Sequence, residues 1–400
     1  MLMKGGWWSG VSRNVRVLGV VSLFNDIASE MIYPVVPIFL TAVLGAPVAV
    51  VGLIEGFVEA TASLLKLASG WFSDRFRRRK PFVVGGYAFS TFSKLLLGVA
   101  YVWPMVLAAR FIDRLGKGIR TSARDALIVE STANGSRGLA FGFHRAMDST
   151  GAVIGPLLAI LLLKIFRDNL RTVFLISVLP AAVGVLLLIF LLRESGVRLE
   201  GRPGRFRLSW RELSPEFKVF LLVSVLFGLG NSSDVFLILR AKDLGLTTVL
   251  AIFAYVLYNL GYVLFSIPAG AVADRIGPRK VLTAGFLVYA LVYLGFGLTG
   301  DARAVWILFP VYGVYIAFTD GVGKAYISNL VAGEKIGTAF GIYQMATGLC
   351  TFLASFIAGL LWTRLGVRTP FYFGSLMALL AVLVFVLPGR RTPAAVARSG

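Results

Sequence analysis

The chain has 400 residues, of which 57% are hydrophobic and only 15% are charged. A soluble globular chain carries roughly a quarter charged residues and under half apolar ones, so the composition argues against a soluble enzyme, a disordered protein and a disulfide scaffold. The formal net charge of +20 is typical of nucleic-acid-binding proteins, yet the long apolar runs leave little soluble surface for such a partner.

Apolar segments bounded by charged residues, Gly or Pro follow one another along the whole chain. Each is long enough to cross a bilayer core of about 30 Å as a helix, and lipid offers no other partners for backbone polar groups. The sequence therefore predicts an all-α membrane protein with twelve transmembrane helices, at 15–44, 47–72, 81–101, 104–124, 139–165, 171–192, 217–240, 247–272, 281–299, 304–328, 337–363 and 369–388.

The basic residues between these segments predict which way the chain crosses the membrane. They are about threefold more frequent on the side that carries both chain ends. This bias predicts a multi-pass protein of the cytoplasmic (inner) membrane with cytoplasmic N- and C-termini. Residues 1–10 lack the apolar core of a signal peptide and are expected to remain as a cytoplasmic end. Most of the net positive charge would then serve to orient the chain in the membrane.

One long charged segment falls halfway along the chain and divides it into two related halves. We expect an N-terminal six-helix bundle at 1–192, a cytoplasmic linker at 193–216, and a C-terminal six-helix bundle with a short cytoplasmic tail at 217–400. The halves repeat one another, because GWFSDRFRRRK at 70–80 is answered by GAVADRIGPRK at 270–280. Such a parallel repeat is typical of transporters whose halves are related about the membrane normal.

These two short loops carry a recognisable motif. It comprises Gly70, Asp74, Arg75 and Arg78 in the first copy and Gly270, Asp274, Arg275 and Arg279 in the second. The motif resembles the signature loop of the major facilitator superfamily, although Arg77 stands where a glycine is usual. The resemblance covers the whole chain and implies the major facilitator fold, with two pseudo-symmetric six-helix bundles. It also implies that the motif residues help to lock the cytoplasmic side closed during the conformational cycle.

Two further segments are similar to motifs of the proton-coupled drug antiporter branch of that family. Gly151, Gly155 and Pro156 resemble its fifth-helix motif, in which small residues four apart let helices approach closely and proline supplies a bend. The match is partial, so ordinary helix packing is the alternative. Arg114 and Lys117 are similar to the fourth-helix arginine motif of the same branch.

Fifteen ionisable residues lie within the predicted spans, where each charge costs about 2.5–3.5 kcal/mol on insertion scales. Many recur at helical spacing, so they share faces that must contact a water-filled cavity or one another. The acids are Asp26, Glu30, Glu55, Glu59, Asp113, Asp148, Asp234 and Asp320, and the bases are Lys66, Lys94, Arg110, Arg114, Lys117, Arg145 and Lys324. Most lie in the first half, which predicts proton or ion chemistry there.

Asp26 and Glu30 are the first candidates for carrying protons. They stand one turn apart, so their mutual repulsion favours a proton on one of them. Acids there that face a fourth-helix arginine also resemble the proton-exchange arrangement of multidrug antiporters. Asp113 beside Arg114 offers a second protonation site. Arg110 is the alternative to Arg114 as the arginine of the fourth-helix motif. The remaining proton-coupling candidates, for which structural ion pairs are the alternative, are Glu55, Glu59 and Asp148.

Polar and aromatic side chains within the spans are candidates for substrate binding, since such a lining suits an amphipathic or ring-bearing solute. In the first half they are Asn25, Tyr33, Arg110, Lys117 and His144. In the second half they are Asn231, Asp234, Tyr258, Asn259, Tyr315, Asp320, Lys324, Tyr343 and Gln344, and the first two also mark a polar break in the seventh span. The alternative for the tyrosines is a packing role. The alternative for Lys324 is that it binds an anionic group on the pseudo-symmetry axis between the two halves.

Together these features predict a secondary active transporter that moves a small organic solute by alternating access. The preferred version is proton-coupled efflux of an amphipathic compound by antiport. The alternatives are a proton symporter or exchanger for an organic anion or metabolite, and a lipid-flipping transporter. A membrane enzyme or receptor is disfavoured, because the sequence offers neither a nucleophile with a base nor a sizeable soluble output domain.

The expected partners are a small-molecule substrate, protons and membrane lipids, with no nucleic acid and a monomeric chain. No cofactor is expected, because the proton gradient would supply the energy. No metal is expected either, since His144 and Cys350 lack metal-ligand spacing.

Overall fold

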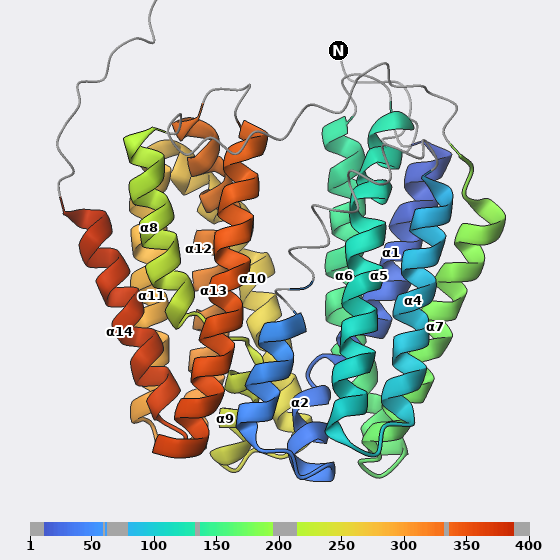
Figure 1. Cartoon of the computed structure of the whole chain (residues 1–400), viewed down its shortest axis with the longest axis horizontal. Coiled ribbons are helices and arrows are strands. Elements are labelled where there is room, and N and C mark those ends of the chain that lie inside the picture. Colours follow the sequence, from blue (N-terminus) through green and yellow to red (C-terminus); the bar gives the residue numbers. More distant parts are fainter. Residues whose placement is uncertain are drawn as a thin grey trace, which may run out of the picture.

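A computed structural model of the chain describes residues 12–58, 61, 79–132, 137–194, 214–331 and 336–387. Within these residues every regular element is a helix and no strand occurs, so the predicted all-α architecture is confirmed. The helices stand side by side in two groups (Figure 1), which are called the first and second bundles below.

The first bundle contains five long helices, α1 and α4 to α7. Its elements are α1 (Arg13–Ile32), α2 (Val36–Ile38), the π-helix η2 (Phe39–Val43), a helix at Val48–Val58, α4 (Lys80–Gly98), α5 (Trp103–Glu130), α6 (Arg137–Ile165) and α7 (Leu170–Leu191). Side-chain caps start two of them, because Ser12 accepts a hydrogen bond from the backbone of Val15 and Asn169 from that of Thr172. α1 packs along α6 and α7, and α4 packs along α5 and α7.

In the second bundle α12 packs along α10 and α11, and α14 packs along α8 and α11. Its elements are α8 (Pro215–Gly230), α9 (Val235–Asp243), α10 (Thr248–Ile276), α11 (Pro278–Leu298), the 3-10 helix η4 (Ala302–Ala304), α12 (Val305–Leu330), α13 (Ile336–Leu365) and α14 (Thr369–Val386). Gly277 joins α10 to α11 with a φ of +92°, a left-handed conformation that only glycine adopts without strain. The expected family motif therefore has a physical reason for glycine at this corner.

Two of the predicted spans are interrupted near their middle. The break expected in the seventh span is present, since α8 ends at Gly230 and α9 begins at Val235. The first span is broken too, between the end of α1 at Ile32 and the start of α2 at Val36. Interrupted helices expose backbone groups inside the membrane and are tolerated where they line a cavity or a binding site.

Among the described residues, nine helical segments are long and apolar enough to cross a membrane. α4 and α5 are not among the nine, because they carry polar and charged residues such as Lys94 and Asp113. Both nevertheless pack against α7 or α1 inside the same bundle. The predicted second span, 47–72, is described only in part, at Val48–Val58. Nine spans are thus observed, and the count of twelve stays a prediction.

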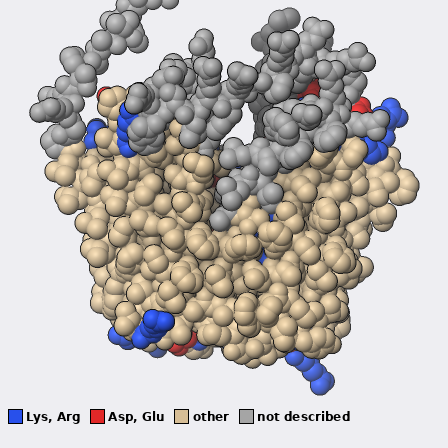
Figure 2. Space-filling model, in the orientation of Figure 1, with Lys and Arg blue, Asp and Glu red and all other residues tan. Residues whose placement is uncertain are grey.

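The surface fits a protein that sits in a bilayer. Large apolar side chains face outward, with Leu179, Phe190 and Leu291 each more than 60% exposed. On the face shown in Figure 2 the charged side chains gather at the two ends of the molecule. An apolar belt between charged ends is what a lipid bilayer requires.

The bundles are joined at one end and separate toward the other. The end where α7 finishes and α8 begins is called the linker end. A large hydrophobic cluster contains residues of both bundles, whereas a smaller one at the linker end, around Leu18 and Tyr87, belongs to the first bundle alone. At the opposite end the backbone amide of Ala49 donates to the Thr363 hydroxyl over 3.1 Å. The domain boundaries expected around 193–216 stay predictions, since 195–213 lie outside the described residues.

Candidate functional site

The two acids of α1 lie where this helix crosses α6. A Cβ atom at Gly151 would lie 2.8 Å from the Cβ atom of Asp26. A Cβ atom at Gly155 would lie 2.8 Å from that of Glu30 and 2.7 Å from the backbone oxygen of Ile27. The two glycines therefore let α6 pass directly over the acids.

Polar residues along one face of α1 contact both their own bundle and the second one. The Asn25 amide donates to the Asp26 carboxylate over 3.2 Å, within α1. The hydroxyl group of Tyr255, on α10, donates to the Glu30 carboxylate over 3.0 Å. The ring of Tyr33 also lies 5.5 Å from that of Tyr255. Glu30 and Tyr33 thus form part of the contact between the bundles.

A buried ion pair links the helix Val48–Val58 to α5. Nη2 of Arg110 lies 2.7 Å from Oε1 of Glu55, and both side chains are buried. Ser233, in the break of the seventh span, donates to the other Glu55 oxygen over 3.4 Å. Glu55 and Arg110, which the sequence assigned to proton coupling and to substrate binding, are therefore each other's partners beside the second bundle.

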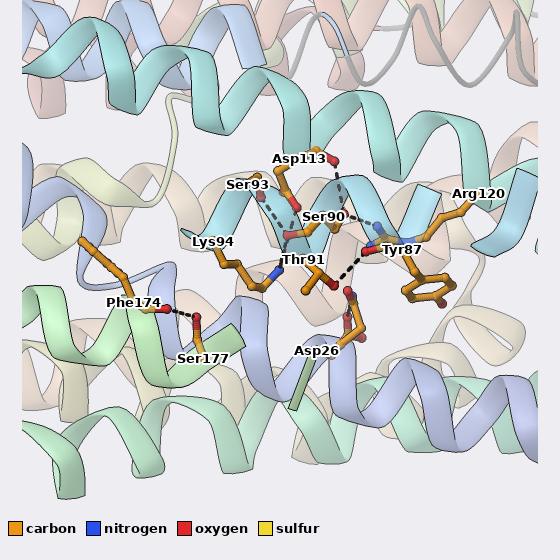
Figure 3. Close-up of polar contacts among 11 residues, drawn as sticks. Asp26, Tyr87, Ser90, Thr91, Ser93, Lys94, Asp113, Arg120, Phe174 and Ser177 are labelled. Atoms are coloured by element: carbon orange, nitrogen blue, oxygen red, sulfur yellow. Dashed lines mark hydrogen bonds and ion pairs between the residues drawn. The ribbon is translucent and has the colours of Figure 1, made fainter. Parts of the chain in front are cut away.

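A second charged cluster lies between α4 and α5 (Figure 3). Lys94 is 2% exposed, and its ammonium group lies 4.0 Å from Oδ1 of Asp113 and donates to the Ser90 backbone oxygen over 3.1 Å. The Ser90 hydroxyl accepts a hydrogen bond from Arg120 and donates to the Asp113 backbone oxygen. Asp26 of α1 is close enough to interact electrostatically with Lys94.

The sequence analysis named Lys94 among the charged residues of the spans but assigned it no functional role. Asp113 was expected beside Arg114, its neighbour in the chain, whereas the structure brings it to Lys94 on another helix. Nε of Arg114 is buried and finds no hydrogen-bond partner among the described residues. The available signal was a lysine inside a predicted span, one turn after Ser90.

His144 and Asp148 form a pair on α6. Nδ1 of His144 lies 3.4 Å from Oδ2 of Asp148, and the other carboxylate oxygen accepts a hydrogen bond from Ser22 of α1. His144 is buried, and its Nε2 atom has no hydrogen-bond partner within the described part of the chain. Asp148 is thus tied to α1 on the same side of α6 as Gly151.

A cavity of about 380 Å³ opens between these helices and α10. Its polar and charged lining consists of Ser22, Asn25, Asp26, Tyr87, Lys117, Arg120, Thr121, Arg124, Arg145, Asp148, Ser149, Asn259 and Tyr262, and its apolar lining of Ala152, Val153 and Val263. Several predicted residues meet here: Asn25, Asp26, Lys117, Asp148 and Asn259. Asn259 also donates to the Tyr255 backbone oxygen over 3.0 Å.

The second bundle contributes an aromatic wall around one acid. Asp234, at the start of α9, accepts a hydrogen bond of 2.6 Å from the hydroxyl group of Tyr312. The rings of Tyr258 and Tyr315 lie 5.3 Å and 5.1 Å from that of Tyr312. Asn231 ends α8 beside them. None of these four predicted residues lines the cavity just described.

A chain of polar contacts connects the two bundles on the linker side of the cavity. Arg145 of α6 donates to the Tyr262 hydroxyl over 3.4 Å, and this hydroxyl donates to the Asp320 carboxylate over 3.3 Å. The ammonium group of Lys324 lies 3.0 Å from the same carboxylate. Asp320 and Lys324 therefore pair with each other on α12, and Tyr262 connects them to the first bundle.

Two predicted substrate residues of α13 lie away from the cavity lining. The ring of Tyr343 stacks on Phe220 of α8 at 5.9 Å, which is a packing contact within the second bundle. Gln344 is exposed. Both remain predictions as binding residues.

The second copy of the family motif holds α11 in place. Gly270 and Arg275 lie in α10 with Asp274, and Arg279 lies in the first turn of α11. Arg279 donates to the backbone oxygen of Phe385 and covers its ring at 5.2 Å, which ties α11 to α14. Of the first copy and its surroundings, the predicted residues Glu59, Gly70, Asp74, Arg75 and Arg78 lie outside the described residues.

The end of the first motif loop is anchored by two acids. The Glu194 carboxylate accepts hydrogen bonds from the backbone amides of Arg79, over 2.7 Å, and of Lys80. The Arg79 side chain lies 3.3 Å from Glu130 of α5. The start of α4 is therefore fixed to the ends of α5 and α7. Within the described ranges no group of three or more His, Cys, Asp or Glu residues could hold a metal ion.

Comparisons with known proteins agree with this architecture. A sequence model described as Major Facilitator Superfamily matches residues 18–257 and 220–400. The chain is 37% identical over 384 residues to an uncharacterised MFS-type transporter of Methanocaldococcus jannaschii, covering 94% of this chain and 95% of the relative. It is 24% identical over 368 residues to multidrug resistance protein 1 of Bacillus subtilis, covering 89% of this chain and 91% of the relative.

The fold is also similar to that of solved structures. A crystal structure of a POT family transporter in complex with a thioalcohol-conjugated peptide superposes with a TM-score of 0.79 at 12% identity, covering 95% of this chain and 98% of that chain. At this identity the likeness concerns the fold alone.

Proposed function

The chain belongs to the major facilitator superfamily, and from this premise we propose that it is a proton-coupled secondary transporter of a small amphipathic organic solute. It is a multi-pass membrane transporter with a small-molecule substrate, as the family and the relatives show. The coupling to protons, the solute class and the direction are the proposed part.

The contact between Glu30 and Tyr255 carries the proposal. It places a titratable carboxylate of the first bundle on a hydroxyl group of the second. A change in the protonation of Glu30 therefore changes the strength of a contact that must break when the bundles rock apart. A ligand can shift a conformational equilibrium only through such a difference in contacts between two states.

The two ends of the molecule support alternating access. Gly52 and Gly359 bring the bundles into backbone contact at the end opposite the linker, since a Cβ atom at Gly52 would lie 2.2 Å from the Ser355 backbone oxygen. The cavity lies on the other side of the Glu30 contact, toward the linker end. With the linker on the cytoplasmic side of the inner membrane, as the basic residues predict, this arrangement is open inward.

The first mode of transport is exchange, in which entering protons drive export of the solute. The similarity to multidrug resistance protein 1 supports this mode, and so does the position of Asp26 on the cavity wall, where a cationic or neutral solute and a proton would compete. Exchange requires that the proton and the solute exclude each other from the site.

The second mode is cotransport of an organic anion with a proton. The four basic residues that line the cavity favour this mode, because protonation of Asp26 would strengthen their attraction for an anion. The two modes predict opposite effects of protons on solute binding.

Purified protein in liposomes that enclose a pH-sensitive dye tests proton coupling in either mode. Ethidium, naphthalene-2-carboxylate and naphthalen-2-ylmethanol serve as cationic, anionic and neutral probes. We expect one probe to change the lumenal pH only in vesicles that contain the protein, and Glu30→Gln to abolish the change. Asp168→Asn, an exposed acid outside the site, is the matched control. Solute movement that is equal with and without a pH gradient would exclude proton coupling.

A further inference from the structure

The cavity between α1, α5, α6 and α10 has the size and the lining of a site for one small organic molecule. Its volume of about 380 Å³ lies within the range of small-molecule pockets. Apolar residues form one part of its wall, at Ala152 and Val153 of α6 and Val263 of α10. Charged residues of α1, α5 and α6 form another part. The lining is therefore amphipathic.

The charges of the lining are unequal in sign. The bases are Lys117, Arg120, Arg124 and Arg145, and the acids are Asp26 and Asp148. Arg120 covers the Tyr87 ring of α4 at 4.4 Å, and Arg124 pairs with its neighbour Asp125 on α5 at 2.9 Å. Lys117 and Arg145 are exposed to the cavity from α5 and α6.

The depth of Lys117 separates it from charges that only set the topology. It lies about 10 Å along α5 from residue 124, where the predicted fourth span ends, at 1.5 Å per residue. A charge inside a span is costly, and Asp26 of α1 is close enough to Lys117 to interact with it electrostatically.

We propose that the transported solute is an organic anion whose charged group binds between Lys117 and Arg145, with its apolar part on Val153 and Val263. This inference rests on the proposed transport function and names its substrate class. A carboxylate, phosphonate or sulfonate group would receive charge-assisted hydrogen bonds from both bases. Tyr262, which accepts from Arg145 and lines the same cavity, would then sense the occupant from the second bundle.

The anion and the proton bind together rather than in competition. Asp26 faces Lys117 and Arg120 of α5 and Asp148 of α6, and Glu30 stands one turn away on α1. A proton on Asp26 removes one of the two negative charges of the lining, so the affinity for an anion rises. By linkage the anion raises the affinity for the proton equally. Because the proton and the anion strengthen each other's binding, the proposal favours cotransport over exchange.

Thermal stabilisation of the purified protein by three naphthalene compounds tests the solute class. The probes are naphthalene-2-carboxylate, naphthalen-2-ylmethanol and naphthalen-2-ylmethylamine, which share their ring and differ in charge. A ligand that binds only the folded state raises Tm with its concentration. We expect the carboxylate alone to raise Tm, with an apparent affinity about tenfold lower or worse in Lys117→Gln and in Arg145→Gln. Lys164→Gln, an exposed lysine outside the cavity, should match the wild type.

Asp26→Asn tests the linkage without a pH change and should tighten binding of the carboxylate. Phenylphosphonate and naphthalene-2-sulfonate serve as two further anionic probes. Stabilisation by the amine or by the alcohol would overturn the anion assignment. Failure of all three anions (the carboxylate, the phosphonate and the sulfonate) to stabilise the protein would overturn it too. So would an unchanged affinity in both basic variants. Anion binding that survives while the liposome assay shows no proton flux would instead overturn proton coupling and leave the anion site standing.

Discussion

The carboxylate of Glu30 in the first bundle accepts a hydrogen bond of 3.0 Å from the hydroxyl group of Tyr255 in the second. A hydrogen bond to an ionised group contributes about 1.5–3 kcal/mol. Tyr255→Phe removes the donor and leaves the ring contact with Tyr33. We therefore expect proton-coupled transport in liposomes to fall about tenfold in this variant.

Tyr101→Phe is the control for that experiment, because Tyr101 is 75% exposed. Unchanged transport in Tyr255→Phe would show that the contact between the bundles does not depend on this hydroxyl group.

The buried pair of Lys94 and Asp113 predicts a strong energetic coupling. Removing one partner of a buried pair costs about 3–5 kcal/mol, since the other charge is left alone, whereas removing both costs much less. We expect Lys94→Met and Asp113→Asn each to lower the thermal stability of the purified protein. The double variant should recover a large part of the loss, which a double-mutant cycle measures. Additive effects of the two substitutions would rule out a direct interaction.

The crossing of α1 and α6 depends on the absence of side chains on α6. Gly155→Ala would place a Cβ atom 2.7 Å from the Ile27 backbone oxygen, so the helices must separate at Glu30. Overpacking of this kind costs about 1–3 kcal/mol, and we expect lower Tm and weaker transport. Gly85→Ala on α4 meets no atom within 4 Å and should be neutral or stabilising. Equal behaviour of the two variants would contradict the role of Gly155.

Backbone contact closes the end opposite the linker, and Gly52→Val should open it. The branched side chain clashes with the Ser355 backbone oxygen of α13, and strain of about 1–3 kcal/mol shifts the equilibrium roughly 5- to 150-fold toward separation. Spin labels at Val43 and Leu365, both exposed at this end, report the separation by electron resonance distance measurement. Gly321→Val, which meets no atom within 4 Å, is the control. A distance distribution that does not change would show that Gly52 is not part of the closed contact.

The sequence was sufficient for those features that depend on one helix at a time. The all-α fold, the family and the polar break before Asp234 follow from hydropathy, motif spacing and local polarity, and the structure and comparisons confirm them. The stripe of Asp26 and Glu30 was also read correctly as one helix face, and that face meets the glycines of α6.

The sequence could not predict which residues on different helices contact one another. The residue spacing in α5 does not predict that Asp113 contacts Lys94 or that Arg110 contacts Glu55. The spacing in α13 likewise does not predict that Tyr343 stacks inside its own bundle. These pairings are set by helix rotation and tilt, which arise only when the whole bundle packs.

The part of the shared hydrophobic cluster that lies toward the end opposite the linker has a mechanical consequence. It can serve as a fulcrum, and the helices that extend from it to the linker end are long levers. α5, with 28 residues, measures about 42 Å, so a tilt of about 10° around one end displaces the other by about 7 Å. A passage wide enough for a small molecule thus needs only a slight repacking at the pivot.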